Sequence, residues 1–202
     1  LYTQEFAEQS IGRRNRYQFL EEVIGRCREI NGLLVSTLCR DHTFRFIQIG
    51  RLLERADMTT RIVDVGASVL LGEERRHTLH KATVDPLMWT CLLRSLSAVG
   101  AYRREYGPNV EADSMVDFVL RDATLPRSVK YCLNDIRVEL LPLKNHQPAL
   151  KILDQARRSL SRFNPHTSNL EQLHLFIDKF QLKIFNLGAA IDEQWLFQNS
   201  DE

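Results

Sequence analysis

The sequence has little of what marks the specialised classes of protein. Its net charge is only +1, from 27 basic and 26 acidic residues, so the composition does not point to nucleic acid or to an acidic membrane surface as a partner. No apolar run reaches the roughly 18 residues that a membrane span needs. The four cysteines are far apart and form no CxxC pair, which excludes a disulfide-rich scaffold. We therefore expect a cytoplasmic protein with reduced thiols at Cys27, Cys39, Cys91 and Cys132.

Sequence motifs for catalysis are also missing. The chain has no Gly-rich phosphate loop, no G-x-S-x-G motif and no credible Cys/His nucleophile pair, so no cofactor is expected. No stretch alternates apolar and polar residues between hairpin turns, so no sheet is expected. With 44% hydrophobic and 26% charged residues, the composition is that of an ordinary globular protein. The sequence predicts an all-α bundle of about six to seven helices, in a single domain over residues 1–202.

Apolar residues recur at helical spacing along most of the chain. The longest such stripe consists of Leu170, Leu173, Ile177, Phe180, Ile184, Leu187, Ile191 and Trp195. Asp85-Pro86 is typical of a helix start, Gly107-Pro108 of a stop, and Ser168-Asn169-Leu170-Glu171 of a capping box. Residues 73–84 are polar and charged, and we expect a loop there. The predicted helices cover approximately residues 16–39, 41–71, 86–107, 113–121, 126–143, 148–163 and 168–195.

The helix predicted over residues 41–71 carries the densest pattern of charge. At 100° per residue it divides into three strips. One is a plain core face, a second apolar strip includes Met58, Val65 and Val69, and a charged row runs between the two. Because this row has apolar neighbours on both sides, we interpret it as facing inward or lining a cleft. The charged row consists of Gly50, Glu54, Asp57, Arg61 and Asp64.

Three roles for the charged row remain open. It could be a salt-bridge network joining helices, with its surplus of acids balanced by arginines, because an unpaired buried charge is very costly. It could be a surface that binds a partner or a ligand. It could also be a metal or acid/base site at Glu54 and Asp57, although no Glu-x-x-His motif supports a metal there. The arginines that could balance the acids are Arg51, Arg94, Arg103, Arg104 and Arg127.

Two other segments carry weaker signals. Arg127 and Ser128 follow Pro126 at a helix start, where free N–H groups could hold a phosphate or carboxylate, or Arg127 could simply pair with a nearby acid. His77 and His80 could share a metal on a helix, but their polar surroundings favour a solvated loop. No metal site is therefore predicted.

The run from Gly50 through Glu54-Arg55 to Asp64 resembles the signature helix of the bacterial alpha-E domain family. Later segments also resemble it, including Ala101-Tyr102-Arg103-Arg104 and Pro126-Arg127-Ser128-Val129. The likeness covers roughly residues 16–145. Members of this family carry a similar Gly-Arg-x-Leu-Glu-Arg helix near their N-terminus. Because no earlier copy of it is present, this chain is expected to be the C-terminal portion of such a domain.

The resemblance implies a helical companion of, or fusion to, circularly permuted ATP-grasp ligases. Transglutaminase-like peptidases and a proteasome-like subunit are other associates of the family. This context implies amide or peptide chemistry, with the ligase supplying the ATP site. The expected function is that of a partner domain without activity of its own, which docks or orients a peptide-like substrate. The alternative is an enzyme that uses Glu54 and Asp57, with Arg127 and Ser128 holding an anionic group. The candidate binding residues are Arg51, Glu54, Arg55, Asp57, Arg61, Asp64, Arg127 and Ser128.

Overall fold

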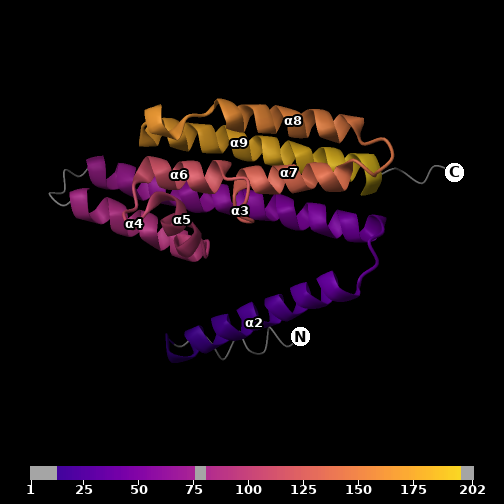
Figure 1. The fold of residues 1–202 in the computed structure, drawn as a ribbon, viewed down its shortest axis with the longest axis horizontal. Coiled ribbons are helices and arrows are strands. Elements are labelled where there is room, and N and C mark those ends of the chain that lie inside the picture. The colour runs from indigo at the N-terminus through magenta and orange to yellow at the C-terminus, as the bar shows by residue number, and fades with distance from the viewer. Residues whose placement is uncertain (1–12, 76–80, 197–202) are drawn as a thin grey trace. The chain divides into compact units, whose positions relative to one another are not determined.

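The computed structural model describes residues 13–75 and 81–196 (Figure 1). The chain divides into two compact units, Leu1–Phe44 and Arg45–Glu202, and each is described by itself. Within the described residues there are eight α-helices and no strand, which confirms the all-α prediction. None of these described helices is both long and apolar enough to cross a membrane. The single domain over residues 1–202 stays a prediction.

The first unit contains α2, Arg13–Thr37, and the start of the next helix. On the surface of α2, Arg26 forms ion pairs with Glu22 and Glu29, one turn away on either side. The side chain of Asp41 accepts a hydrogen bond of 3.0 Å from the backbone N–H of Phe44. Asp41 therefore caps the long helix that follows.

The second unit is a bundle in which α7 and α9 run alongside the long helix α3, and α8 packs against α7 and α9 (Figure 1). Helix α3 begins in the first unit and continues through the second. A 3₁₀ turn, Pro165–Thr167, precedes α9, and a π-helical turn, Asp192–Leu196, follows it. The helices are α3 (His42–Arg75), α4 (Lys81–Ser95), α5 (Val99–Tyr106), α6 (Ala112–Arg121), α7 (Val129–Leu140), α8 (Gln147–Arg162) and α9 (Leu170–Ile191).

The core forms where the predicted apolar faces meet. On α3 the buried apolar residues include Ile49, Leu52, Ala56, Val63, Ala67 and Leu70, and on α9 they are Leu173, Ile177, Phe180, Ile184, Leu187 and Ile191. A close approach between α3 and α4 requires a glycine at position 66. A Cβ atom there would lie 2.4 Å from Cδ1 of Leu92 and 3.2 Å from the ring of Trp89. Both predicted stripes are therefore confirmed as core faces.

The helix predicted over residues 86–107 is wrong in two ways. It begins earlier, at Lys81, so that Pro86 lies inside α4 and removes one backbone hydrogen bond there. It is also broken in the middle, because Ser97 takes a left-handed conformation with φ of 55° and α5 begins anew at Val99. This break accounts for the additional helix.

Two further predicted boundaries differ from the structure. The region expected to be a loop, residues 73–84, is helical at both of its described ends, because α3 reaches Arg75 and α4 begins at Lys81. The capping box before α9 lies one residue later than predicted. Asn169 accepts from the N–H of Gln172, and the Gln172 side chain accepts from the N–H of Asn169.

Candidate functional site

The charged row of α3 lies at the border between solvent and the rest of the bundle. Glu54 and Arg61 are exposed, whereas Asp57 and Asp64 are half-buried. The expectation that the whole row is sheltered is therefore wrong. It rested on apolar neighbours, and the second apolar strip is itself exposed at Met58 (46%), Val65 (57%) and Val69 (40%). An apolar neighbour on a helix is evidence for burial only when another element covers it.

Within the charged row, Asp57 and Arg61 satisfy each other. Nε of Arg61 donates to Oδ2 of Asp57 at 2.6 Å, one helical turn away. The hydrogen bond and the charge of Asp57 raise the pKa of Arg61 above its ordinary value, so the guanidinium stays protonated. The pair holds the Arg61 guanidinium at the surface of α3, about two helical turns from Glu54. Among the described residues, no hydrogen bond or ion pair reaches the Glu54 carboxylate.

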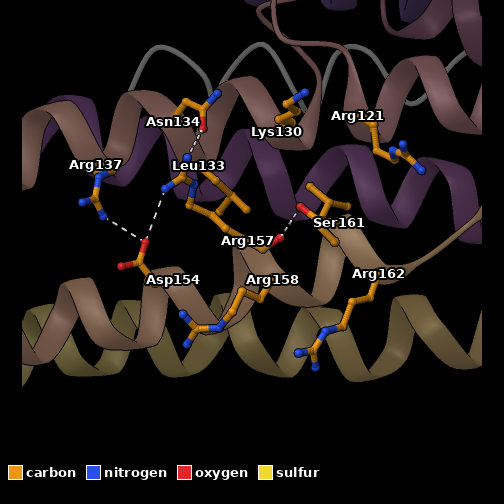
Figure 2. A pocket seen from close by; sticks show the side chains of 11 residues that line it. Arg121, Lys130, Leu133, Asn134, Arg137, Asp154, Arg157, Arg158, Ser161 and Arg162 are labelled. Atoms are coloured by element: carbon orange, nitrogen blue, oxygen red, sulfur yellow. Dashed lines mark hydrogen bonds and ion pairs between the residues drawn. The ribbon is translucent and has the colours of Figure 1, made fainter.

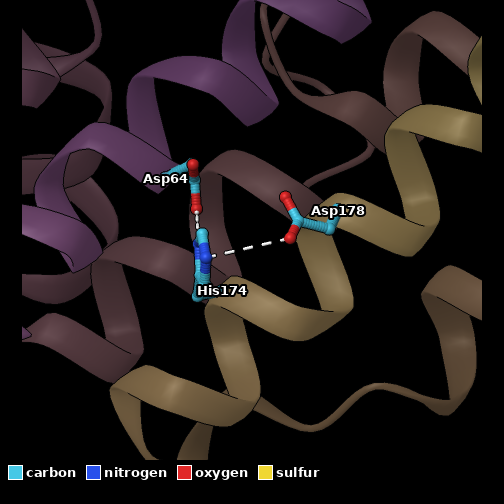
Figure 3. Close-up of side chains that lie close together, drawn as sticks. All are labelled: Asp64, His174 and Asp178. Carbon is cyan, nitrogen blue, oxygen red and sulfur yellow. Dashed lines mark hydrogen bonds and ion pairs between the residues drawn. The ribbon is translucent and has the colours of Figure 1, made fainter.

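Asp64, at the end of the charged row, reaches a neighbouring helix. Its Oδ1 atom lies 2.5 Å from Nδ1 of His174 on α9, and Nε2 of His174 lies 3.7 Å from Oδ2 of Asp178 (Figure 3). The histidine ring thus stands between two carboxylates and links α3 to α9. The hydrogen bond and charge of Asp64 raise the pKa of His174 above its ordinary value.

The same three residues form the group that comes closest to a metal site within the described parts of the chain. Their potential ligand atoms all lie within 4.8 Å of one another. Because Nδ1 of His174 faces Asp64, only Nε2 and Asp178 could bind one cation, with Asp64 orienting the ring from behind. Zinc sites use three or four protein ligands. The arrangement fits a hydrogen-bonded bridge between two helices better than a metal centre.

The side of α3 next to the charged row holds the turn before α7. Nη1 of Arg55 donates to the carbonyl oxygen of Pro126 at 3.2 Å, and the Thr59 hydroxyl donates to the carbonyl oxygen of Arg127 at 2.8 Å. These carbonyls precede the helix and have no backbone partner within it, although the Pro126 carbonyl also accepts a weak hydrogen bond from Sγ of Cys132 at 3.7 Å. Arg55 therefore has a structural role, anchoring the turn to α3, while its neighbour Glu54 points to solvent.

Ser128 is buried and fully engaged. Its hydroxyl donates to the carbonyl oxygen of Asp122 and accepts from the backbone N–H of Tyr131, so it is the N-cap of α7. The side chain of Arg127 is exposed. The structure therefore brings no free hydroxyl from Ser128 to the predicted anion site at this helix start.

Asp57 pairs with Arg61, as their i,i+4 spacing indicates, but the other arginines proposed to balance the surplus acids form no ion pair with the charged row among the described residues. Within the described residues, the partner from another helix is His174, and no ion pair joins the charged row to an arginine outside α3. Arg51 is half-buried, and its Nη1 atom lacks a hydrogen-bond partner there. His174 was missed because only arginines were considered. Its spacing of four from Asp178 on the polar face of a helix was the available signal. His77 and His80 lie outside the described residues.

These observations define a helical domain whose longest helix carries a partly exposed charged row. A model of the Alpha-E family, described as a predicted alpha-helical domain with a conserved ER motif, matches residues 2–196, and the chain belongs to that family. The match is wider than the expected residues 16–145. Neither the search of curated proteins nor that of solved structures found a match. The chain has Glu-Arg pairs at 54–55 and 74–75, and Glu54 of the first pair lies in the charged row.

Proposed function

We propose that this chain is a helical partner domain of a circularly permuted ATP-grasp ligase, and that it docks or orients a peptide-like substrate through the exposed border of α3. The exposed border consists of Glu54, Met58, Arg61 and Val65. Transglutaminase-like peptidases are a second class of partner under the same proposal. The ligase would supply the ATP site and the amide chemistry, and this domain would supply a recognition surface.

The exposed border carries this proposal because it combines two properties. Met58 and Val65 leave about half of their surface in solvent, at 46% and 57%, on the helix that runs through the core of the unit. Glu54 and Arg61 lie one turn from Met58, which gives the strip charges of both signs. Methionine and arginine are enriched at protein interfaces, where an apolar centre is surrounded by polar groups.

The Glu54-Arg55 pair supports the proposal because its two side chains point to different surroundings. Consecutive helical residues point about 100° apart, so the two side chains cannot serve the same neighbour. Arg55 points to the turn before α7 and bonds to the carbonyl oxygen of Pro126. Glu54 points to solvent and, among the described residues, makes no ion pair. Glu54 therefore forms no contact that would stabilise the fold among the described residues, and binding a partner is a role that fits its exposure.

The experiment is co-purification of the domain with the ATP-grasp ligase from the same genome, followed by assay of product formation. Glu54→Ala and Arg61→Ala should each weaken complex formation or lower the product yield. Matched controls are Glu105→Ala and Arg104→Ala, because both residues are exposed on another helix, α5. Unchanged complex and unchanged yield with both α3 variants would contradict the proposal.

The geometry gives less support to the alternative, an enzyme that uses Glu54 and Asp57. Asp57 is engaged by Arg61 at 2.6 Å, and Ser128 is buried with its hydroxyl occupied. A general acid or base needs a proton acceptor or donor within reach of the reacting group. Retained metal in the purified protein, or turnover by the domain without a ligase, would favour the enzyme over the partner domain.

A further inference from the structure

A basic pocket lies between α7 and α8, on a different part of the bundle from the charged row (Figure 2). Its volume is about 650 Å³, which is within the range of small-molecule sites. Leu133 and Leu160 form its apolar part. The basic residues that line it are Arg121, Lys130, Arg137, Arg157, Arg158 and Arg162, and the acidic residue that lines it is Asp154.

The single acid balances only a part of this charge. Asp154 accepts from Arg137 at 2.9 Å, across the pocket from α7, and from Arg157 at 3.3 Å, on its own helix α8 (Figure 2). Arg157 also donates to Oδ1 of Asn134 at 3.0 Å. Arg121 is paired outside the pocket, with Asp117 at 3.1 Å.

The remaining three cations, Lys130, Arg158 and Arg162, have no ion pair among the described residues. All three are exposed. In Figure 2 the side chains of Arg158 and Arg162 extend from α8 on the side away from α7, and neither is held by Asp154. The pocket therefore has a surplus of positive charge, although the whole chain has a net charge of only +1.

This surplus is unfavourable for the protein alone. Arg158 and Arg162 are four residues apart on α8, where like charges repel each other. Arg157 and Arg158 are adjacent in the same helix turn. A bound anion would remove this repulsion and would replace the hydration of several side chains by charge-assisted hydrogen bonds, which are stronger than neutral ones.

The layout of the cations indicates the class of anion. Lys130 and Arg137 are seven residues apart on α7, about 10 Å along the axis of the helix. A row of that length suits an extended anion more than a single small one. Each phosphate group carries about 1.5 to 2 negative charges near neutral pH, whereas a carboxylate carries one. The planar guanidinium also matches phosphate oxygens with two parallel hydrogen bonds.

We propose that the basic pocket binds an oligophosphate, either free or as the phosphate chain of a nucleotide. No aromatic side chain lines the pocket, so a nucleobase has no ring to stack on. The phosphates supply the affinity, and Asp154 sets the positions of Arg137 and Arg157 in the empty pocket. The proposal does not depend on the exposed border of α3 or on the ligase.

The test is isothermal titration calorimetry of the full 202-residue chain with inorganic tripolyphosphate, at low and at moderate salt. We expect saturable binding of one tripolyphosphate per chain, which weakens steeply as salt is raised. Orthophosphate should bind at least about ten-fold more weakly. ATP should bind about as well as tripolyphosphate. Binding of ATP without binding of tripolyphosphate would overturn the proposal, as would equal affinity for orthophosphate and tripolyphosphate.

Variants locate the binding. The double variant Arg158→Gln/Arg162→Gln should weaken tripolyphosphate binding at least about ten-fold. Arg103→Gln/Arg104→Gln is the matched control, because it removes the same charge from exposed positions on α5 and should change the affinity little. Asp154→Asn should tighten binding, because it frees Arg137 and Arg157. Equal losses in the two double variants, or weaker binding in Asp154→Asn with the fold intact by circular dichroism, would overturn the proposal.

Discussion

Two polar regions of this bundle differ in how their charges are satisfied. On α3 and the turn beside it, most polar groups have partners within the chain: Asp57 has Arg61, Asp64 has His174, and Ser128 has two backbone groups. In the basic pocket, six cations face one acid, Asp154. The first region is a structural network with an exposed edge. The second is built with more charge than the chain balances.

The comparison shows that the density of charge in a sequence is a poor guide to a ligand site. The charged row of α3 is dense but nearly self-sufficient, with only Glu54 left unpaired in the described part of the chain. The residues of the basic pocket come from α6, α7 and α8, so no single segment of the sequence contains the whole site. The basic pocket differs from the charged row because it keeps an excess of positive charge after all its ion pairs have formed.

The largest expected effect on stability is at Ser128, whose hydroxyl has hydrogen-bond partners within the chain. Ser128→Ala removes the N-cap of α7 and the donor to the Asp122 carbonyl, and it should lower the free energy of unfolding by roughly 1–3 kcal/mol. Urea unfolding followed by circular dichroism measures the change. Ser161→Ala is the control, because this exposed serine bonds only to the carbonyl of Arg157 among the described residues, and it should cost less than about 0.5 kcal/mol. A Ser128→Ala protein as stable as the control would show that Ser128 is free for another role.

The bridge between Asp64 and His174 should make stability depend on pH. Because Asp64 raises the pKa of folded His174 above its ordinary value of 6.5, the bridge stabilises fully below pH 6.5. Its contribution is lost as pH rises through the raised pKa of the folded state. The pair is half-exposed, so we expect less than about 1 kcal/mol.

The measurement for this bridge is urea unfolding between pH 5.5 and 9, compared for the wild type and Asp64→Asn. The difference between the two proteins should shrink toward high pH. If the difference in the free energy of unfolding stays constant across this range, the charge of Asp64 does not affect the protonation of His174.

In the basic pocket, Asp154→Asn should have opposite effects on folding and on binding. Loss of the ion pairs with Arg137 and Arg157, which are about one-third exposed, should lower the free energy of unfolding by less than about 1 kcal/mol. Added tripolyphosphate should then raise the melting temperature of this variant more than that of the wild type, because ligand binding stabilises the folded state. Differential scanning fluorimetry with and without the ligand measures both. An equal shift in the two proteins would contradict the idea that Asp154 competes with an anion.

The smallest effect is expected at Glu54. Glu54→Gln should change the free energy of unfolding by no more than about 0.5 kcal/mol, because the side chain is exposed and unpaired among the described residues. Thermal unfolding of the two proteins at neutral pH measures the change. A cost above 1 kcal/mol would require a partner that the described residues do not show, and the charged row would then be structural throughout.

The sequence predicted the helices and their buried faces because period and burial are local properties. The stripe from Leu173 to Ile191 and the core face of α3 are the clearest cases. It did not predict the break at Ser97. A left-handed backbone conformation is usually signalled by a glycine, and here the residue is a serine. Nor could it predict that Met58 and Val65 are exposed, because an apolar side chain on a helix says nothing about what covers it. His174 and the basic pocket depend on which helices become neighbours, which is a property of the tertiary fold.

The most direct test of the proposed function is the affinity of the ATP-grasp ligase for the domain with and without Met58→Asp. Met58 lies in the middle of the exposed border of α3 and is 46% exposed, so an aspartate there should leave the fold intact, which circular dichroism can check. The account predicts that the dissociation constant, measured by calorimetric titration of the purified proteins, rises at least about ten-fold. An unchanged dissociation constant for the folded variant would contradict it.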